Sequence, residues 1–543
     1  MNTNPSHAAP VSARRRYGTL VILCFATLLL AIDMTVLHLA VPSLVEDIEP
    51  SATQLLWIAD IYGFALGGLL ITMGNLGDRI GRKRLLLSGA VAFGFASALT
   101  AFASDPNLLI AARALLGIAG ATIMPSAAAI LRNVFTDRRQ RSTAIGIWSA
   151  MSASGFALGP VVGGVMLENY WWGSVFLINL PVMAVVFVAG VIVIPESRNP
   201  RAGRIDLLSV VLSFVGIIGL IYGIKEAAHN GIGTTDALTS LAVGAVVMSW
   251  FVLRQTRLPE PLMDLKLFRS RAFTGAVATN VVTVFGMIAL SLMMAQYLQL
   301  VLGWSPLIAG IAGIPGGLSA GLTGPFAARL ATAWGRGKTV GLGMALLAVS
   351  LVLYLRLDLD PNYWTILPAM VVGGAGMGLG FAITNDIVLS SVPKERSGAA
   401  VSIVETATEM GGALGIAVLG SVMNAAYADS LEIPAGVPAE AAAPIREQIG
   451  TAFAVAEQLP GELAEAVRHA SKVAFIDGAH LGTGVAAVIV GVFAVIALVT
   501  LRGKFVTAEE EGDEGGSGSA GGAAGAAGVE AGEVAVSAAA SAK

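Results

Sequence analysis

Long apolar segments recur along this chain, and they constrain its fold more than any other feature. A helix needs roughly 20 mainly apolar residues to cross the hydrocarbon core of a bilayer. Segments of about this length lie near residues 17–40, 54–74, 85–103, 107–131, 143–167, 172–194, 206–224, 237–254, 273–302, 306–330, 339–356, 364–391, 398–427 and 479–501. Only 13% of the residues are charged, whereas soluble domains average roughly 25%. The sequence therefore predicts an all-α integral membrane protein with 14 transmembrane helices.

The distribution of basic residues predicts how these helices are oriented. The segment 17–40 follows Arg14, Arg15 and Arg16, but it is longer than the roughly 7–15 apolar residues of a signal peptide, so we expect it to be retained. Most of the 33 Lys and Arg residues fall on one side of the membrane. The other side holds Lys225, Arg356, Arg446, Arg468 and Lys472. Because cytoplasmic loops carry the excess of Lys and Arg, we expect a cell-membrane protein with both termini in the cytoplasm.

Two segments are expected to lie outside the membrane. Residues 428–476 form a long external loop, in which 438–457 and 461–472 have helical composition. They suggest either an amphipathic hairpin over the external mouth or a tolerated surface insertion. The tail 506–543 is acidic and then rich in Gly, Ala and Ser, so we expect it to be disordered.

A short segment between the second and third apolar segments combines glycine with charge. It reads Gly74-Asn75-Leu76-Gly77-Asp78-Arg79-Ile80-Gly81-Arg82-Lys83-Arg84. Two helices must turn here within a few residues, and the three glycines allow close backbone approach and positive φ. Asp78 can accept charge-assisted hydrogen bonds from nearby arginines. The ordered pattern is too specific for a merely basic hairpin.

Two further helices carry unusual residues. Arg113 lies within the segment 107–131, where a charge is disfavoured by roughly 2.5–3.5 kcal/mol, so it should face a polar interior and have an acidic partner. The segment 143–167 contains a stripe of small residues that would let another helix pack closely, with a proline that would bend it. These residues are Gly155, Gly159, Pro160, Gly163 and Gly164.

The residues at 74–84, around Arg113 and at 155–164 resemble motifs A, B and C of major facilitator superfamily drug exporters. The segments 31–42 and 56–62 resemble signatures of its fourteen-span drug:proton antiporters, although His38 departs from many relatives. The resemblance implies an N-terminal tail (1–14), two six-helix halves (15–195 and 270–505) and two helices between them (196–269). It also implies a monomer that works by alternating access around a site near the midplane.

Five carboxylates lie inside the predicted helices: Asp33, Asp60, Asp386, Glu405 and Glu409. Intramembrane acids usually line a pathway or carry protons, and burial disfavours the ionised form, so such groups can exchange protons near neutral pH. We expect Asp33 to couple proton movement, with Arg113 as its neighbour. The resemblance supports functional positions for Asp33, Asp60 and Glu405. Asp386 has no counterpart in the family and could instead form a salt bridge or cap. Since Arg113 is the only basic residue predicted inside a span, it cannot neutralise five acids.

Aromatic residues in these helices could contact a lipophilic cation through cation–π interactions, although such rings more often anchor or pack a membrane protein. They are Trp57, Tyr62, Trp148, Phe156, Phe285, Tyr297 and Phe381.

The function expected is export of lipophilic cations, such as quaternary ammonium compounds, dyes and antibiotics, in exchange for protons. We expect no enzyme activity, no cofactor or metal, and no nucleic-acid partner. The histidines are scattered without an HExxH pattern, and Thr332 stands where a phosphate loop ending at Gly337-Lys338-Thr339 needs glycine. Two alternatives remain: a dedicated exporter of one antibiotic or metabolite, and a non-transporting membrane sensor.

Overall fold

The computed structural model describes residues 12–50, 52–198, 206–231, 233–259, 261–359, 362–392 and 397–500. This part of the chain is all-helical, as predicted, and contains no strand. The terminal tails predicted at 1–14 and 506–543 lie outside the described residues, apart from 12–14. The first helices are α1 (Ala13–Ile48), α2 (Ala52–Ile80), α3 (Arg82–Ala101), α4 (Pro106–Val134), α5 (Arg138–Asn169), α6 (Ser174–Leu177) and α7 (Asn179–Val193). Next come α8 (Leu207–Asn230) and α9 (Thr235–Arg257).

The remaining helices follow a short 3-10 turn (Leu265–Arg269). They are α10 (Arg271–Gln296), α11 (Pro306–Trp334), α12 (Arg336–Leu353), α13 (Tyr363–Ser390), α14 (Ser397–Ser430), α15 (Ala439–Glu447), α16 (Ile449–Ala456) and α17 (Gly461–Thr500). A π-helical turn (Tyr297–Val301) continues α10, and a 3-10 turn (Tyr354–Arg356) continues α12.

Twelve segments of the described chain are long and apolar enough to cross a membrane. The predicted spans 143–167 and 273–302 fall on α5 and α10, which are 32 and 26 residues long but are not among these twelve. The count of 14 is therefore not established by length and composition. The predicted span 172–194 corresponds to α6 and α7, which are separated at Ile178.

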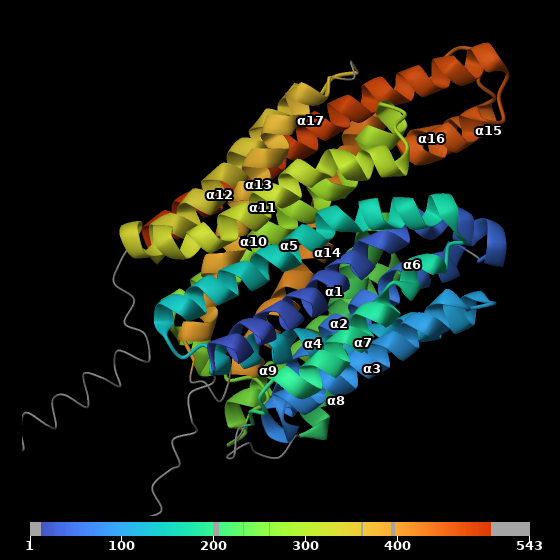
Figure 1. Cartoon of the computed structure of the whole chain (residues 1–543). Helices are drawn as coiled ribbons and strands as arrows, with labels where there is room; N and C mark the ends of the chain where they lie inside the picture. Colours follow the sequence, from blue (N-terminus) through green and yellow to red (C-terminus); the bar gives the residue numbers. More distant parts are fainter. Residues whose placement is uncertain are drawn as a thin grey trace, which may run out of the picture.

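The helices pack into two bundles that meet along α5 and α11. One apolar core is built mainly by α1–α5 and α7, and another by α10–α14 and α17. Figure 1 shows the blue to teal helices on one side and the yellow to red helices on the other. Glycine allows the close contact between the bundles: a Cβ on Gly146 would lie 2.7 Å from the carbonyl oxygen of Gly324, and a Cβ on Gly164 would lie 3.0 Å from Cα of Leu307. The two helices therefore run antiparallel and touch near both of their ends.

The segment between the two bundles forms a helical pair that packs on both of them. Helix α8 packs against α9, and it also contacts α2 and α14. A buried cluster of Phe64, Leu212, Ile217, Phe251 and Ala413 joins these helices. The pair is therefore part of the packed structure, and α8 brings its side chains to the junction of the two bundles.

The segment 428–476 is helical over most of its length. Helices α15 and α16 fold back on α17, which begins at Gly461 and continues without interruption through the last predicted span. One continuous helix therefore joins 461–472 to the last predicted span, so the external segment predicted to end at 476 is not set off from that span by a break in the helix. Tyr427 Oη donates a hydrogen bond to the Ile445 carbonyl oxygen at 2.8 Å. The hairpin packs on the C-terminal bundle, as Figure 1 shows for α15 and α16 beside α17.

Candidate functional site

Helix α1, which carries Asp33, lies directly against the glycine stripe of α5. A Cβ on Gly155 would lie 2.8 Å from the Leu28 carbonyl oxygen, and one on Gly163 would lie 2.7 Å from Cγ2 of Val36. A Cβ on Gly159 would overlap the Thr35 hydroxyl. The stripe thus sets how closely α1 approaches α5, and α5 continues as a helix through Pro160.

Asp33 is almost completely buried, at 1% exposure, and it forms a polar cluster with two neighbouring helices. The Asn179 side-chain amide donates to Oδ1 of Asp33 at 2.8 Å and to the Ser97 hydroxyl at 3.0 Å. Asn179 begins α7, just after the break at Ile178, and Ser97 lies on α3. The other carboxylate oxygen, Oδ2 of Asp33, is buried and has no hydrogen-bond partner in the described structure. Asp33 therefore keeps an unused acceptor.

Arg113 faces the interior, as predicted, but its contacts differ from those expected. Its Nε donates to the Ile58 carbonyl oxygen at 2.7 Å, and its guanidinium lies 5.3 Å from the centre of the Tyr62 ring and 5.9 Å from that of Phe176. The charges of Arg113 and Asp33 interact, yet no ion pair within 4 Å joins them among the described residues. A main-chain carbonyl on α2 takes the place of the expected acidic partner.

Four buried polar atoms in this region have no hydrogen-bond partner in the described structure. They are Asp33 Oδ2, Tyr62 Oη, Arg113 Nη1 and Asn179 Oδ1. They come from α1, α2, α4 and α7. Buried polar atoms are normally paired, so this arrangement offers donors and acceptors to a proton or an incoming polar group.

Asp60 on α2 is paired with a basic residue of the intervening helices. Its Oδ1 forms an ion pair with Nζ of Lys225 on α8. Lys225, predicted just beyond the span 206–224, lies within α8, which continues to Asn230. Trp57, one turn from Asp60, stacks on Tyr222 of α8 with ring centres 5.9 Å apart.

Asp386 also has a basic partner. Its Oδ2 accepts from Arg336 Nη2 at 2.8 Å, and Asp386 is 3% exposed. Of the two structural alternatives expected for this residue, the salt bridge is the one observed. Two of the five acids, Asp60 and Asp386, are thus paired with Lys225 and Arg336, basic residues that were predicted outside the spans.

Glu405 and Glu409 lie on α14 of the C-terminal bundle, and their charges interact with each other. Glu409 points toward α2: a Cβ on Gly67 would lie 3.4 Å from Cγ of Glu409, and one on Gly63 would lie 3.8 Å from Oε2. The structure therefore brings Glu409 to the same face of α2 that carries Asp60. It does not bring either glutamate into contact with Asp33.

The segment 74–84 forms the turn between α2 and α3. Gly81 has φ of 114°, a left-handed conformation that favours glycine. Arg82 Nε donates to Oδ1 of Asp78 at 2.8 Å, and both residues are buried. A Cβ on Gly77 would lie 3.1 Å from Cδ2 of Leu85. Gly74 and Arg79 lie on the last turns of α2.

The seven aromatic candidates are dispersed. Trp57 and Tyr62 lie beside Asp60 and Arg113, as described above. Trp148 is buried in the N-terminal bundle, Phe285 packs in the C-terminal one, and Tyr297 donates a hydrogen bond to the Asp358 carbonyl oxygen at 2.7 Å. Phe381 is partly buried on α13. The side chains of Phe156 and His38 lie outside the described residues.

Sequence reasoning missed two residues of these clusters. Asn179 is a lone amide in an otherwise apolar segment and is followed closely by Pro181. A polar side chain inside a predicted span was the feature that could have marked it as a site residue. Lys225 follows the apolar part of its segment directly, so hydropathy alone placed it outside the membrane.

The comparison with known protein families decides what kind of protein carries this site. The family model of the Major Facilitator Superfamily matches residues 23–416. The chain belongs to this superfamily. Members of this superfamily are transporters, which are not enzymes.

Other members resemble this chain over most of their length. The multidrug efflux pump LfrA of Mycolicibacterium smegmatis is 39% identical over 90% of this chain and 97% of its own. The methyl viologen resistance protein SmvA of Salmonella typhimurium is 34% identical, covering 85% of this chain and 93% of its own. A tetracenomycin C resistance and export protein of Streptomyces glaucescens is 31% identical, covering 90% and 92%. The human organic anion transporter MFSD10 has a similar fold, with a TM-score of 0.59 at 14% identity over 90% of this chain and 99% of that chain.

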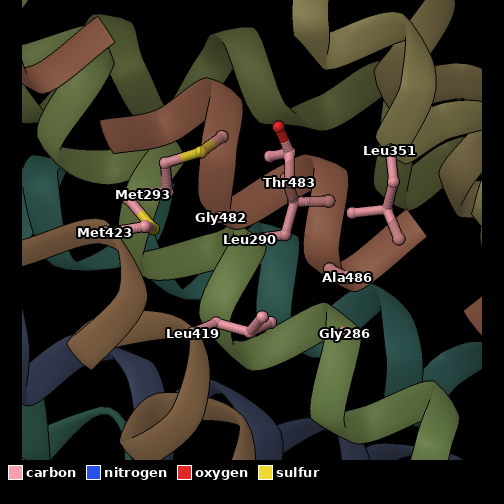
Figure 2. Close-up of a pocket in the computed structure, with 9 residues that line it drawn as sticks. All are labelled: Gly286, Leu290, Met293, Leu351, Leu419, Met423, Gly482, Thr483 and Ala486. Carbon is pink, nitrogen blue, oxygen red and sulfur yellow. The ribbon is translucent and has the colours of Figure 1, made fainter. Parts of the chain in front are cut away.

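An apolar pocket, apart from the acids described above, lies within the C-terminal bundle between α10, α12, α14 and α17 (Figure 2). It is lined by Gly286, Leu290, Met293, Leu351, Leu419, Met423, Gly482, Thr483 and Ala486. Thr483 is its only polar lining residue, and that hydroxyl donates to the Ala479 carbonyl oxygen at 2.7 Å. The pocket carries no charge, so it is not the site of the acids. Among the described residues, no group of three His, Cys, Asp or Glu side chains could hold a metal ion.

Proposed function

We propose that this protein is a proton-coupled multidrug efflux antiporter that exports lipophilic cations by alternating access. It acts as a monomer with 14 transmembrane helices and cytoplasmic termini, and it needs no cofactor beyond the proton gradient. The two six-helix halves at 15–195 and 270–505 rock against each other, with the helices of 196–269 between them. This assignment is supported by relatives named as a multidrug efflux pump and a methyl viologen resistance protein. Each aligns with most of this chain and with most of its own length.

Asp33 carries the proposal. It is a buried carboxylate with one oxygen held by Asn179 and the other unpartnered. A carboxylate in such an apolar place is costly when ionised unless a cation or a proton neutralises it. The group is therefore suited to taking up a proton in one step of a cycle and releasing it in another. Arg113, fixed to the Ile58 carbonyl oxygen, favours the ionised form when the proton leaves.

The driving force can be stated in energy terms. One proton entering down 100 mV supplies roughly 2.3 kcal/mol, and a monovalent cation leaving against the same potential consumes that amount. Export therefore needs more than one proton per cation, or a pH gradient. Several titratable acids in the two bundles meet this requirement.

The glycine motifs have supporting roles in this proposal. The segment 74–84 holds the cytoplasmic ends of α2 and α3 through the Asp78–Arg82 pair, and it acts as a gate. The stripe at 155–164 packs α5 against α1 and α11, and it acts as the hinge along which the halves move.

A second candidate is a dedicated exporter of one antibiotic or metabolite. The tetracenomycin C resistance and export protein, which aligns with 90% of this chain, favours it. Susceptibility tests against chemically unrelated compounds separate the two: a multidrug pump protects cells from several classes, a dedicated exporter from one.

The direct test uses purified protein in liposomes with an imposed pH gradient. Internal pH is followed while ethidium is added, for the wild type and for Asp33→Asn. We expect ethidium to dissipate the gradient with the wild type and not with the variant. If the variant dissipates the gradient as fast as the wild type, Asp33 does not couple proton movement. If the wild type responds to no cation but moves a neutral antibiotic, the dedicated exporter is the correct assignment.

A further inference from the structure

The ammonium group of Lys225 lies in surroundings suited to a lipophilic cation. It forms an ion pair with Asp60 of α2 and lies 5.3 Å from the centre of the Phe64 ring. Lys225 belongs to α8, which contributes no residue to either six-helix half and lies between them in sequence. Its side chain and that of Asp60 are about one quarter exposed, at 28% and 25%. The pair is therefore accessible and not sealed in a core.

Phe64, next to Lys225, belongs to a group of three aromatic rings in contact with one another. Trp57 and Tyr222 are stacked, with centres 5.9 Å apart and planes 17° apart. Phe64 meets both of them edge-on, at 6.0 Å from Trp57 and 6.3 Å from Tyr222. Aromatic rings recognise quaternary ammonium groups through cation–π attraction, and a carboxylate beside them adds an opposite charge. In this protein the ammonium is supplied by the chain itself.

The C-terminal bundle supplies the remaining side of the cluster. The charge of Lys225 acts on Glu409 of α14, whose stem lies against Gly67 of α2. Helices α2, α8 and α14 all contact one another. Lys225 is therefore placed where the N-terminal half, the C-terminal half and the intervening helices meet, so movement of the halves would change its surroundings.

A purely structural salt bridge is the simplest alternative. It would brace α8 against α2, but a well-packed apolar pair would do so without desolvating two charges. Lys225 also lies within a segment, Leu207–Ala227, that is long and apolar enough to cross a membrane, where an ammonium is costly. The Phe64 ring beside the ammonium and the rings of Trp57 and Tyr222 packed on Phe64 are not needed for bracing. These features favour a role in ligand recognition.

We propose that Lys225 is a built-in competitor of the transported cation, and that its ammonium occupies the site formed by Asp60, Phe64, Trp57 and Tyr222 until a lipophilic cation displaces it. This inference rests on the proposed function and gives the intervening helices a part in it. A tethered group acts at an effective concentration in the millimolar range. Small hydrated cations therefore fail to displace Lys225, whereas a cation that also gains contact with the aromatic rings succeeds.

The test is equilibrium binding of radiolabelled tetraphenylphosphonium to the purified full-length protein in nanodiscs. Lys225→Met removes the charge and keeps a stem of similar length, and Lys225→Arg is the control that keeps the charge. We expect Lys225→Met to bind at least about fivefold more tightly than the wild type, because the competitor is gone. Lys225→Arg should remain within about twofold. Asp60→Asn should bind weakly whatever residue stands at 225.

Lys225→Gln provides a second neutral variant if Lys225→Met gives little folded protein. Monodispersity and thermal unfolding show that the compared proteins are intact. Unchanged or weaker binding by both intact neutral variants overturns the proposal, as does binding by none of the proteins. If the neutral variants bind more tightly but neither they nor the wild type exchange the cation for protons, the competitor role stands and the antiport function fails. The two proposals are thereby tested separately.

Discussion

The contact between α5 and α11 at Gly146 predicts how the two bundles respond to a single methyl group. In Gly146→Ala the new Cβ would lie 2.7 Å from the Gly324 carbonyl oxygen, and 3.2 Å from its carbonyl carbon. Ordinary contact begins near 3.4 Å, and both neighbours are main-chain atoms that cannot rotate away. The helices must therefore separate by about 0.7 Å at this end, and overpacking of this kind costs about 1–3 kcal/mol. That cost applies only while the ends are in contact.

Alternating access requires this end of the interface to open, so the substitution should favour the opened state by about 5- to 150-fold. Ser149, which accepts a hydrogen bond from Asn385 across the interface at 3.0 Å, is replaced by Cys in a Cys24→Ser background. The rate of labelling by a membrane-impermeant maleimide in inside-out vesicles is then measured. Gly313→Ala on α11 is the control, because its Cβ would meet nothing within 4 Å. Equal labelling rates for Gly146→Ala and Gly313→Ala in folded protein would refute the reasoning.

Three further outcomes are expected. Asp78→Ala removes the 2.8 Å ion pair with the buried Arg82 and should destabilise the protein by about 1.5–3 kcal/mol, as expected for a hydrogen bond between charged groups; an unchanged unfolding midpoint in detergent would contradict this. Asn179→Leu removes the amide donor to the buried acid of α1, a loss of about 1.5–3 kcal/mol, and should lower proton-coupled uptake at least about tenfold while the yield of folded protein is kept. The hydrogen bond from Arg254 lowers the pKa of Asp206, just before α8, to about 2, so its stabilising contribution is complete above about pH 4 and is lost as the pH falls toward 2. Asp206→Asn should therefore lose part of the pH dependence of thermal unfolding below pH 4, and an identical pH profile would show that this pair contributes nothing.

The helices were predictable because membrane insertion imposes one local rule on them. Backbone groups in lipid must be satisfied within the helix, so each long apolar segment had to be helical wherever it lay in the chain. The close contacts of the 155–164 stripe were predictable for the same local reason, since glycines spaced four apart remove side chains from one face. Neither inference needed knowledge of which helix would be the neighbour.

The partners of the charged residues were not predictable in this way. Arg113 was expected to meet an acid, but it donates to the Ile58 carbonyl oxygen, a group that every residue possesses and that no pattern marks. Lys225 was placed in a loop because hydropathy falls at the end of its segment, although α8 continues for five more residues to Asn230. A long side chain at a helix end can reach back along the helix, so its position in sequence does not give the position of its charge.

The pairing of the acids bears on how many protons the proposed cycle can use. Asp60 pairs with Lys225 and Asp386 with Arg336, whereas Asp33, Glu405 and Glu409 form no ion pair with any basic side chain in the described part of the chain. Intramembrane acids are costly when ionised and usually line a pathway or carry protons, so acids without such a partner are suited to hold a proton or an incoming cation. Export of one monovalent cation against the membrane potential is balanced by the entry of one proton, so the potential drives net transport only when a second proton enters. Three unpaired acids provide sites for two protons and one cation, and they are divided between α1 of one bundle and α14 of the other. A cycle in which these three acids bind two protons and one cation in turn therefore needs no further acid. In such a cycle Asp60 is left to select the cation.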